Sequence, residues 1–324
     1  MAKNDNIQDL LTDVANAIRE RKGTSELINP QDFSKEIKSI NYHGYTGHAD
    51  AEGLKAIGWT DEDIAYYQTY GVDWNEEDDN KHLVSDDNKA LYGVLTASNI
   101  AEYKERIVYL PKIDTSGITD VSDMFRDCYN MVALPMIDTS SAISAGKLFY
   151  QCYSLRTIPP LDLSNVTYML SLLNMCTSLI YCPPIDTRKS KNCSYLFYLT
   201  YSLTEMPNID LSNCSNFVSI FYNCYSIRSI KLDLRSITSL DNIKSMLHWN
   251  YCLRDLKISH LVSNLSISDM RLLTKESILY IINNEAATDT ITITLHSYVY
   301  EKYAEDAEVV EALANHPNIL LASA

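Results

Sequence analysis

A repeat with a period of 24 residues runs through residues 110–257 and constrains the fold more than any other feature. A period of this length predicts a solenoid of about six coils, because each unit buries its apolar face only by stacking on its neighbours. A sixth, degenerate unit begins at Ile230. The five complete units, from Leu110 onward, are LPKIDTSGITDVSDMFRDCYNMVA, LPMIDTSSAISAGKLFYQCYSLRT, IPPLDLSNVTYMLSLLNMCTSLIY, CPPIDTRKSKNCSYLFYLTYSLTE and MPNIDLSNCSNFVSIFYNCYSIRS.

Apolar side chains recur at fixed positions of the unit and predict which residues face inward. The sixteenth position holds Phe125, Phe149, Leu173, Phe197 and Phe221. Proline fills the second position of every complete unit, where its missing N–H must point away from a β ladder. Joining one unit to the next gives the Leu-x-x-Leu spacing of leucine-rich repeats. We therefore expect a short strand near the proline and a helical or 3₁₀ segment over the sixteenth position.

The units resemble the BspA-like leucine-rich repeats, whose pattern is I-D-T-S-x-V-T-x-M-x-x-M-F-x-x-C-x-S-L. The resemblance covers roughly half of the chain. It implies a right-handed solenoid with parallel strands. With the flanking segments, the expected fold is α/β: a leucine-rich-repeat solenoid with a helical amino-terminal segment and α/β caps. The resemblance does not assign a function, because repeat folds serve many functions.

Residues 1–44 predict two short helices that assemble and attach the protein. Each carries apolar residues at helical spacing, and neither is long enough to be stable alone. Their apolar faces need a partner, either the next domain or copies of the chain and another protein. The near-heptad spacing in the first helix predicts a homo-oligomer, in particular a trimer. The assembly residues are Ile7, Leu10, Leu11, Val14, Ile18, Phe33 and Ile37.

Two further stretches resemble known protein modules. IQDLLTDVANAIRERKG followed by INPQDFSKEIKSI resembles the amino-terminal module of tailed-phage fibre and tail-associated proteins. AEGLKAIGWTDEDIAYYQ and SDDNKALYGVLT, within residues 45–109, are similar to a block that precedes such repeats in proteins of gut Bacteroides and their crAss-like phages. These resemblances imply a virion location and contacts with other virion proteins through the amino-terminal segment.

The segments on either side of the repeats are expected to be caps. Residues 45–109 predict helices over 50–57, 60–70 and 98–106, with a first strand at Ile107. Residues 258–324 predict a helix over 276–285, a strand over 291–295, a long helix over 297–315 and a last strand over 319–322. Open solenoids need such caps for solubility.

An acidic loop in the amino-terminal cap invites a calcium interpretation. An EF-hand would need glycine at Asp78 and glutamate at Val84, so we expect a solvated loop. The alternating oxygen-bearing residues are Asp73, Asn75, Glu77 and Asp79.

The formal charge of -15 argues against nucleic acid as a partner, because phosphate binding needs clustered lysine and arginine. The acidic excess lies in residues 45–109 and after residue 257, which favours solubility of the two ends. No run of about 18 apolar residues predicts a membrane span, and the polar first ten residues do not resemble a signal peptide.

Two further columns, one of cysteine and one of aspartate, run through the units. A cysteine column predicts small buried side chains, although its spacing leaves disulfides between adjacent coils open. Zinc is disfavoured because no Cys-x-x-Cys occurs. An aspartate column, usually followed by Thr or Ser, predicts Asx turns. A calcium ladder and paired catalytic carboxylates are the less favoured alternatives for this column. The columns are Cys128, Cys152, Cys176 and Cys224, and Asp114, Asp138, Asp162, Asp186 and Asp210.

Tyrosines form two further columns, three positions apart. Tyrosine offers a rigid ring with a polar tip, so these columns predict either a ligand-binding face or rings that pack on one another. The first column holds Tyr150, Tyr198 and Tyr222, and the second holds Tyr129, Tyr153, Tyr201 and Tyr225.

The function expected from these features is that of a virion structural protein. We find no nucleophile elbow, P-loop, dinucleotide fingerprint or His-Glu-x-x-His motif, and we expect neither catalysis, nor a cofactor, nor a metal. The leading hypothesis is a head or tail fibre of a tailed phage whose solenoid contacts a host surface glycan or protein. A bacterial BspA-like adhesion or interaction protein is the alternative, and a glycan-degrading enzyme is a third.

Overall fold

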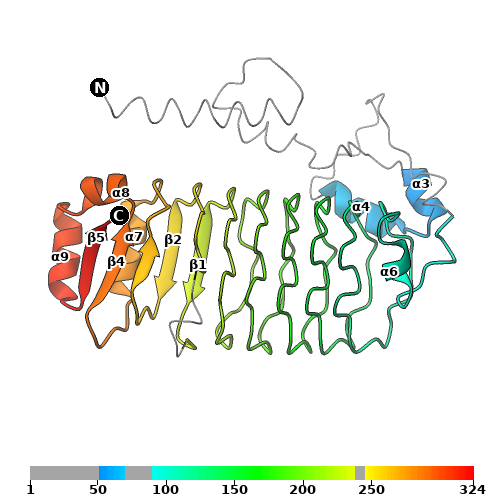
Figure 1. The fold of residues 1–324 in the computed structure, drawn as a ribbon, viewed down its shortest axis with the longest axis horizontal. Coiled ribbons are helices and arrows are strands. Elements are labelled where there is room, and N and C mark those ends of the chain that lie inside the picture. Colours follow the sequence, from blue (N-terminus) through cyan, green and yellow to red (C-terminus); the bar gives the residue numbers. More distant parts are fainter. Residues whose placement is uncertain (1–50, 70–89, 238–244) are drawn as a thin grey trace, which may run out of the picture.

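The computed structural model describes residues 51–69, 90–237 and 245–324. The predicted assembly segment over residues 1–44 and the acidic loop around Asp73 lie outside these ranges. The described chain is mixed α/β and winds through a row of stacked coils, with helices at both ends of the row (Figure 1).

Neighbouring coils are joined by backbone hydrogen bonds between equivalent positions. Phe125 N donates to Leu148 O at 3.0 Å, and Phe149 N donates to Leu172 O at 3.0 Å one coil later. On either side of the phenylalanine, Asp123 and Asp127 have left-handed φ angles of 57° and 61°, and the following coils repeat this pair as far as Ser245 and Trp249. Left-handed residues of this kind break a helix, so the predicted helical segment is a turn.

The expected strand near the proline was wrong for the complete units. Among the described residues 107–228, parallel pairing is limited to isolated bridges such as Tyr109 with Ala133 and Ile185 with Ile209. Regular strands begin at β1 (Ser229–Asp233), which pairs in parallel with β2 (Asp255–Ser259). The second position of these coils holds lysine, so the N–H that proline removes is restored there.

The amino-terminal helices are α3 (Ala51–Ala56), α4 (Asp61–Thr69) and α6 (Ile100–Tyr103). The last of these is much shorter than the helix predicted over 98–106. Instead of a first strand at Ile107, the chain makes the single bridge at Tyr109.

Helix α4 lies across the first three coils (Figure 1) and is tied to their backbone by aromatic donors. Trp59 Nε1, just before α4, donates to Leu110 O at 2.8 Å. The hydroxyls of Tyr67 and Tyr66 donate to Leu134 O at 2.6 Å and to Ile158 O at 2.8 Å. These three carbonyls occupy the first position of successive units. The proline that follows each of them has no N–H and cannot donate to a neighbouring coil. Side-chain donors from the α4 region therefore supply hydrogen bonds to these carbonyls.

Asp63 connects α4 to the second coil. Its carboxylate accepts hydrogen bonds from Thr60 N at 2.7 Å and from Met136 N at 2.7 Å. Burial raises the pKa of Asp63, but these hydrogen bonds and the nearby Lys112 outweigh it, so the pKa lies below its ordinary value. The carboxylate is therefore held in its charged form.

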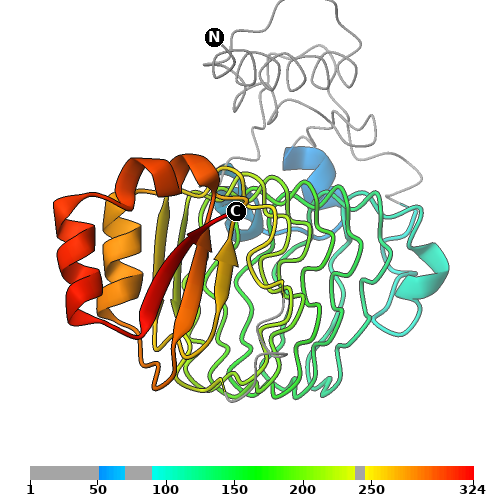
Figure 2. The same cartoon turned by 60° about the vertical axis from the view of Figure 1, so that its left-hand side comes forward.

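The carboxy-terminal end is a parallel sheet with helices. Strands β3 (Leu265–Ile267), β4 (Ile291–Leu295) and β5 (Ile319–Ser323) pair in that order. Helix α7 (Lys275–Asn283) packs against β2 and α9 (Ala307–Asn315) against α7, continuing the row of coils (Figure 2). The expected boundary at residue 257 falls inside β2.

The long helix predicted over 297–315 was wrong. Two helices stand there, α8 (Ser297–Tyr303) and α9. The side chain of Asp306 caps the start of α9 by accepting from Glu308 N at 3.0 Å, which fixes the break.

One continuous core fills the coils. The rings of Phe125 and Phe149 stack at 5.4 Å, as do those of Phe197 and Phe221. All eight cysteines are free, and seven of them are buried. The prediction of small buried side chains is confirmed for the cysteine column, in which Cys152 Sγ donates to Phe125 O at 3.1 Å.

Candidate functional site

In each of the two tyrosine columns, the rings stack wherever two consecutive coils both carry tyrosine. We call Tyr150, Tyr198 and Tyr222 the first row and Tyr129, Tyr153, Tyr201 and Tyr225 the second row. Ring centroids are 4.9 Å apart for Tyr198 and Tyr222 in the first row. In the second row they are 5.4 Å apart for Tyr129 and Tyr153 and 5.0 Å apart for Tyr201 and Tyr225. The rings therefore pack on one another, as one of the two interpretations predicted.

Both rows are interrupted at the third coil. Asn174 stands in the first row and Thr177 in the second, and both are buried. Beyond this gap the rows are extended by Trp249, which lies 5.0 Å from Tyr222, and by Tyr251, which lies 5.7 Å from Tyr225. The interruption divides the aromatic surface into two parts, and the larger lies toward the carboxy-terminal end.

The carboxy-terminal part of the rows is open to solvent. Tyr225, Trp249 and Tyr251 are 38%, 41% and 46% exposed, whereas the other row members are half-buried. We call Tyr222, Tyr225, Trp249 and Tyr251 the aromatic patch. Large exposed aromatic groups on a rigid support are typical of contact surfaces. Packing and binding are thus compatible here, because stacking covers ring faces and leaves part of each exposed side chain in solvent.

The sequence columns did not include Trp249 and Tyr251, because the sixth unit departs from the 24-residue register. A local signal was nevertheless present. Tyr251 is followed two residues later by Leu253, as Tyr225 is followed by Ile227.

Three tyrosines of the rows and the aromatic patch have a raised pKa and are therefore neutral hydrogen-bonding groups at physiological pH. Burial, followed by the neighbouring hydroxyl groups, raises the pKa of Tyr153 and of Tyr198 above its ordinary value. Burial and then the charge of Asp269 do the same for Tyr251. Neutral hydroxyls can both donate and accept hydrogen bonds, which suits contacts with sugars and with protein backbone.

Cations cover the amino-terminal ends of both rows. The Arg126 guanidinium lies 5.3 Å from the ring centroid of Tyr150, and Lys104 Nζ lies 6.0 Å from that of Tyr129. Lys104 also pairs with Asp127 at 3.4 Å. These contacts make this end of the rows part of the protein's own packing.

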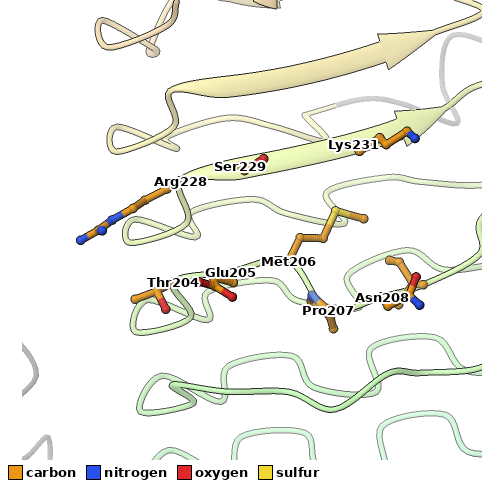
Figure 3. Close-up of a pocket in the computed structure, with 9 residues that line it drawn as sticks. Thr204, Glu205, Met206, Pro207, Asn208, Arg228, Ser229 and Lys231 are labelled. Carbon is orange, nitrogen blue, oxygen red and sulfur yellow. The ribbon is translucent and has the colours of Figure 1, made fainter.

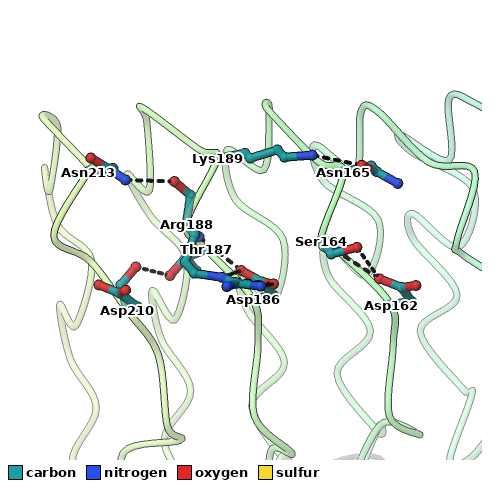
Figure 4. A network of polar contacts seen from close by, with 9 residues as sticks. All are labelled: Asp162, Ser164, Asn165, Asp186, Thr187, Arg188, Lys189, Asp210 and Asn213. Atoms are coloured by element: carbon teal, nitrogen blue, oxygen red, sulfur yellow. Dashed lines mark hydrogen bonds and ion pairs between the residues drawn. The ribbon is translucent and has the colours of Figure 1, made fainter.

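The aspartate column forms the Asx turns that its sequence predicts (Figure 4). Ser164 N and Ser164 Oγ both donate to Asp162 Oδ1, at 3.0 and 2.6 Å. The same pair of bonds occurs between Ser116 and Asp114, and it holds the pKa of each aspartate below its ordinary value. Each carboxylate is satisfied locally.

Polar side chains also link one coil to the next on this face (Figure 4). Asn213 Nδ2 donates to Arg188 O at 3.1 Å, and Lys189 Nζ donates to Asn165 Oδ1 at 2.7 Å. Arg188 is paired with Asp186 at 2.6 Å. Across the described ranges, no group of histidine, cysteine and acidic side chains has a metal-binding arrangement.

Within the same ranges, no helix has the length and apolar character needed to cross a membrane. Comparisons of the chain with protein-family models, with curated proteins and with solved structures found no match.

Proposed function

We propose that this chain is a structural protein of a tailed-phage virion, a head or tail fibre that contacts a surface through a leucine-rich-repeat solenoid. The observation that carries the surface-contact function is the aromatic patch, held by stacking on rigid coils. The exposed parts of its rings can contact sugar rings or apolar side chains, and its hydroxyls can hydrogen-bond to the same ligand. The function requires no catalytic group.

The virion location is supported by the resemblance of residues 1–44 to fibre modules. In this proposal those residues join the chain into a homo-oligomer, in particular a trimer, and dock it onto other virion proteins. Light scattering should show the complete chain as a trimer and a chain that begins at Tyr45 as a monomer. The same oligomeric state for both proteins would remove the assembly role from residues 1–44.

The location is tested by mass spectrometry of purified phage particles. Peptides of this chain should co-purify with the particles in a constant ratio to the other virion proteins. Recovery from a bacterial envelope and not from particles would instead favour the BspA-like adhesion protein.

The aromatic patch is tested by adsorption to host cells. Replacing Tyr225 and Tyr251 together by alanine should reduce adsorption at least tenfold and lower the melting temperature by only a few degrees, because the lost ring contacts lie at the surface and not in the core. The matched control replaces Tyr92 and Tyr298, which are 49% exposed but lie outside the patch. Equal loss in both double variants would refute a specific role for the patch.

A further inference from the structure

A groove of about 610 Å³ lies between the fifth coil and β1, close to the second tyrosine row. One wall is formed by residues 204–209 and the other by Arg228, Ser229 and Lys231 (Figure 3). The Met206 side chain extends from the first wall toward β1 (Figure 3). The volume is within the range of about 300–1,000 Å³ typical of small-molecule sites.

The groove continues the face that α4 covers on the first three coils. There, aromatic donors satisfy the first-position carbonyls of Leu110, Leu134 and Ile158. Met206 holds the first position of the fifth unit, and no donor to its carbonyl is found in the described part of the chain. The repeat thus presents, beyond α4, a backbone acceptor of the kind that hydroxyl groups bind on the earlier coils.

The groove is lined by more cations than anions, in a chain whose net charge is -15. Arg228 and Lys231 are exposed and make no side-chain hydrogen bond or ion pair with any described residue. Their side chains point to opposite ends of the groove, and the acid Glu205 belongs to the other wall (Figure 3). The next coil brings both signs of charge: Lys257, the register partner of Lys231, is ion-paired with Asp255 at 3.8 Å, and Asp255 also accepts from Ser229 Oγ at 3.1 Å. Arg254, whose N–H donates to Arg228 O at 3.0 Å, adds a further cation.

We propose that this groove binds an acidic saccharide, a sugar that carries a carboxylate. Carboxylates of such a saccharide would pair with Arg228 at one end of the groove and with Lys231 at the other, and its hydroxyls would donate to the Met206 carbonyl and to Glu205. This inference rests on the proposed surface-contact function and names the class of ligand. It assigns the charge recognition to the groove and the ring contacts to the adjoining aromatic patch.

The chemistry favours a sugar over an acidic peptide. In an acidic peptide the donors are backbone N–H groups, which are set apart from the side-chain carboxylates, whereas a sugar acid carries hydroxyl donors on the same ring as its carboxylate. An oligo-uronate carries carboxylates spaced along a chain of hydroxyl donors, which matches a cation at each end of the groove and an open carbonyl in its wall. The hydroxyls of Tyr66 and Tyr67 already fill the equivalent positions on the earlier coils.

The test is calorimetric titration of the complete protein with trigalacturonate and with its methyl ester. The ester keeps the sugar ring and removes the charge. We expect binding of the acid that weakens with added salt and at least tenfold weaker binding of the ester. Changing Arg228 and Lys231 together to alanine should weaken binding of the acid at least tenfold. The matched control changes Lys191 and Lys302, two exposed lysines outside the groove, and should bind as the parent does.

Three results would overturn the proposal: equal affinity for acid and ester, equal loss in both double variants, or tighter binding of poly-glutamate than of trigalacturonate. The unfolding midpoints of the variants, measured in parallel, separate loss of the site from loss of the fold. Binding of trigalacturonate by a protein that is absent from phage particles would retract the virion location and leave the groove assignment standing.

Discussion

Replacing Phe197 by alanine tests whether the stacked coils share one core. Its side chain is fully buried, and its ring stacks on that of Phe221 at 5.4 Å with an interplanar angle of 3°. Alanine removes the whole ring and leaves a cavity between coils. Such changes cost about 3–5 kcal/mol in the free energy of unfolding, a figure that includes about 0.5–1.5 kcal/mol from the aromatic pair.

The structure also supplies a matched control. Leu173 occupies the equivalent position of an earlier coil and is fully buried there. Replacing Phe197 by leucine should therefore cost about 1.5 kcal/mol or less, as conservative core changes do. Urea unfolding of the complete protein, followed by circular dichroism, gives both values. A cost below about 1 kcal/mol for alanine would show that this position is not part of the core.

Three further measurements test the polar framework. Changing Tyr67 to phenylalanine removes the hydroxyl that donates to Leu134 O and accepts from Leu134 N, and should cost about 1–3 kcal/mol in urea unfolding; an unchanged midpoint would contradict this. Aspartates whose pKa is lowered on folding, such as Asp63, stabilise the protein fully above about pH 4, and this contribution is lost as the pH falls through the folded pKa. Acid titration of stability should therefore show a decline below pH 4 that is shallower in the Asp63→Asn variant, and an identical decline would exclude this role. A thiol reagent should label Cys252 first in the native protein, because it is the exposed cysteine even though partial burial raises its pKa, and should label all eight cysteines in urea. Burial raises the pKa of Cys128 to about 12 and shields the other thiols, so native labelling of several thiols at the rate of Cys252 would refute the buried column.

The sequence alone located the side chains of the core. Phe125, Phe197 and the cysteine column are buried where the 24-residue period places them, because a strict apolar period leaves each unit only one face to stack. The Asx turns were equally predictable. An aspartate followed two residues later by serine makes its hydrogen bonds within its own loop.

Backbone pairing was decided by the tertiary structure. A proline shows where an N–H is missing, but not what binds the carbonyl beside it. Here α4 brings Trp59 and Tyr67 to those carbonyls from residues far away in the sequence. The same applies to the aromatic patch and the groove. Trp249 and Lys231 meet their neighbours only because the coils stack, and contacts between coils depend on three-dimensional register and not on local sequence.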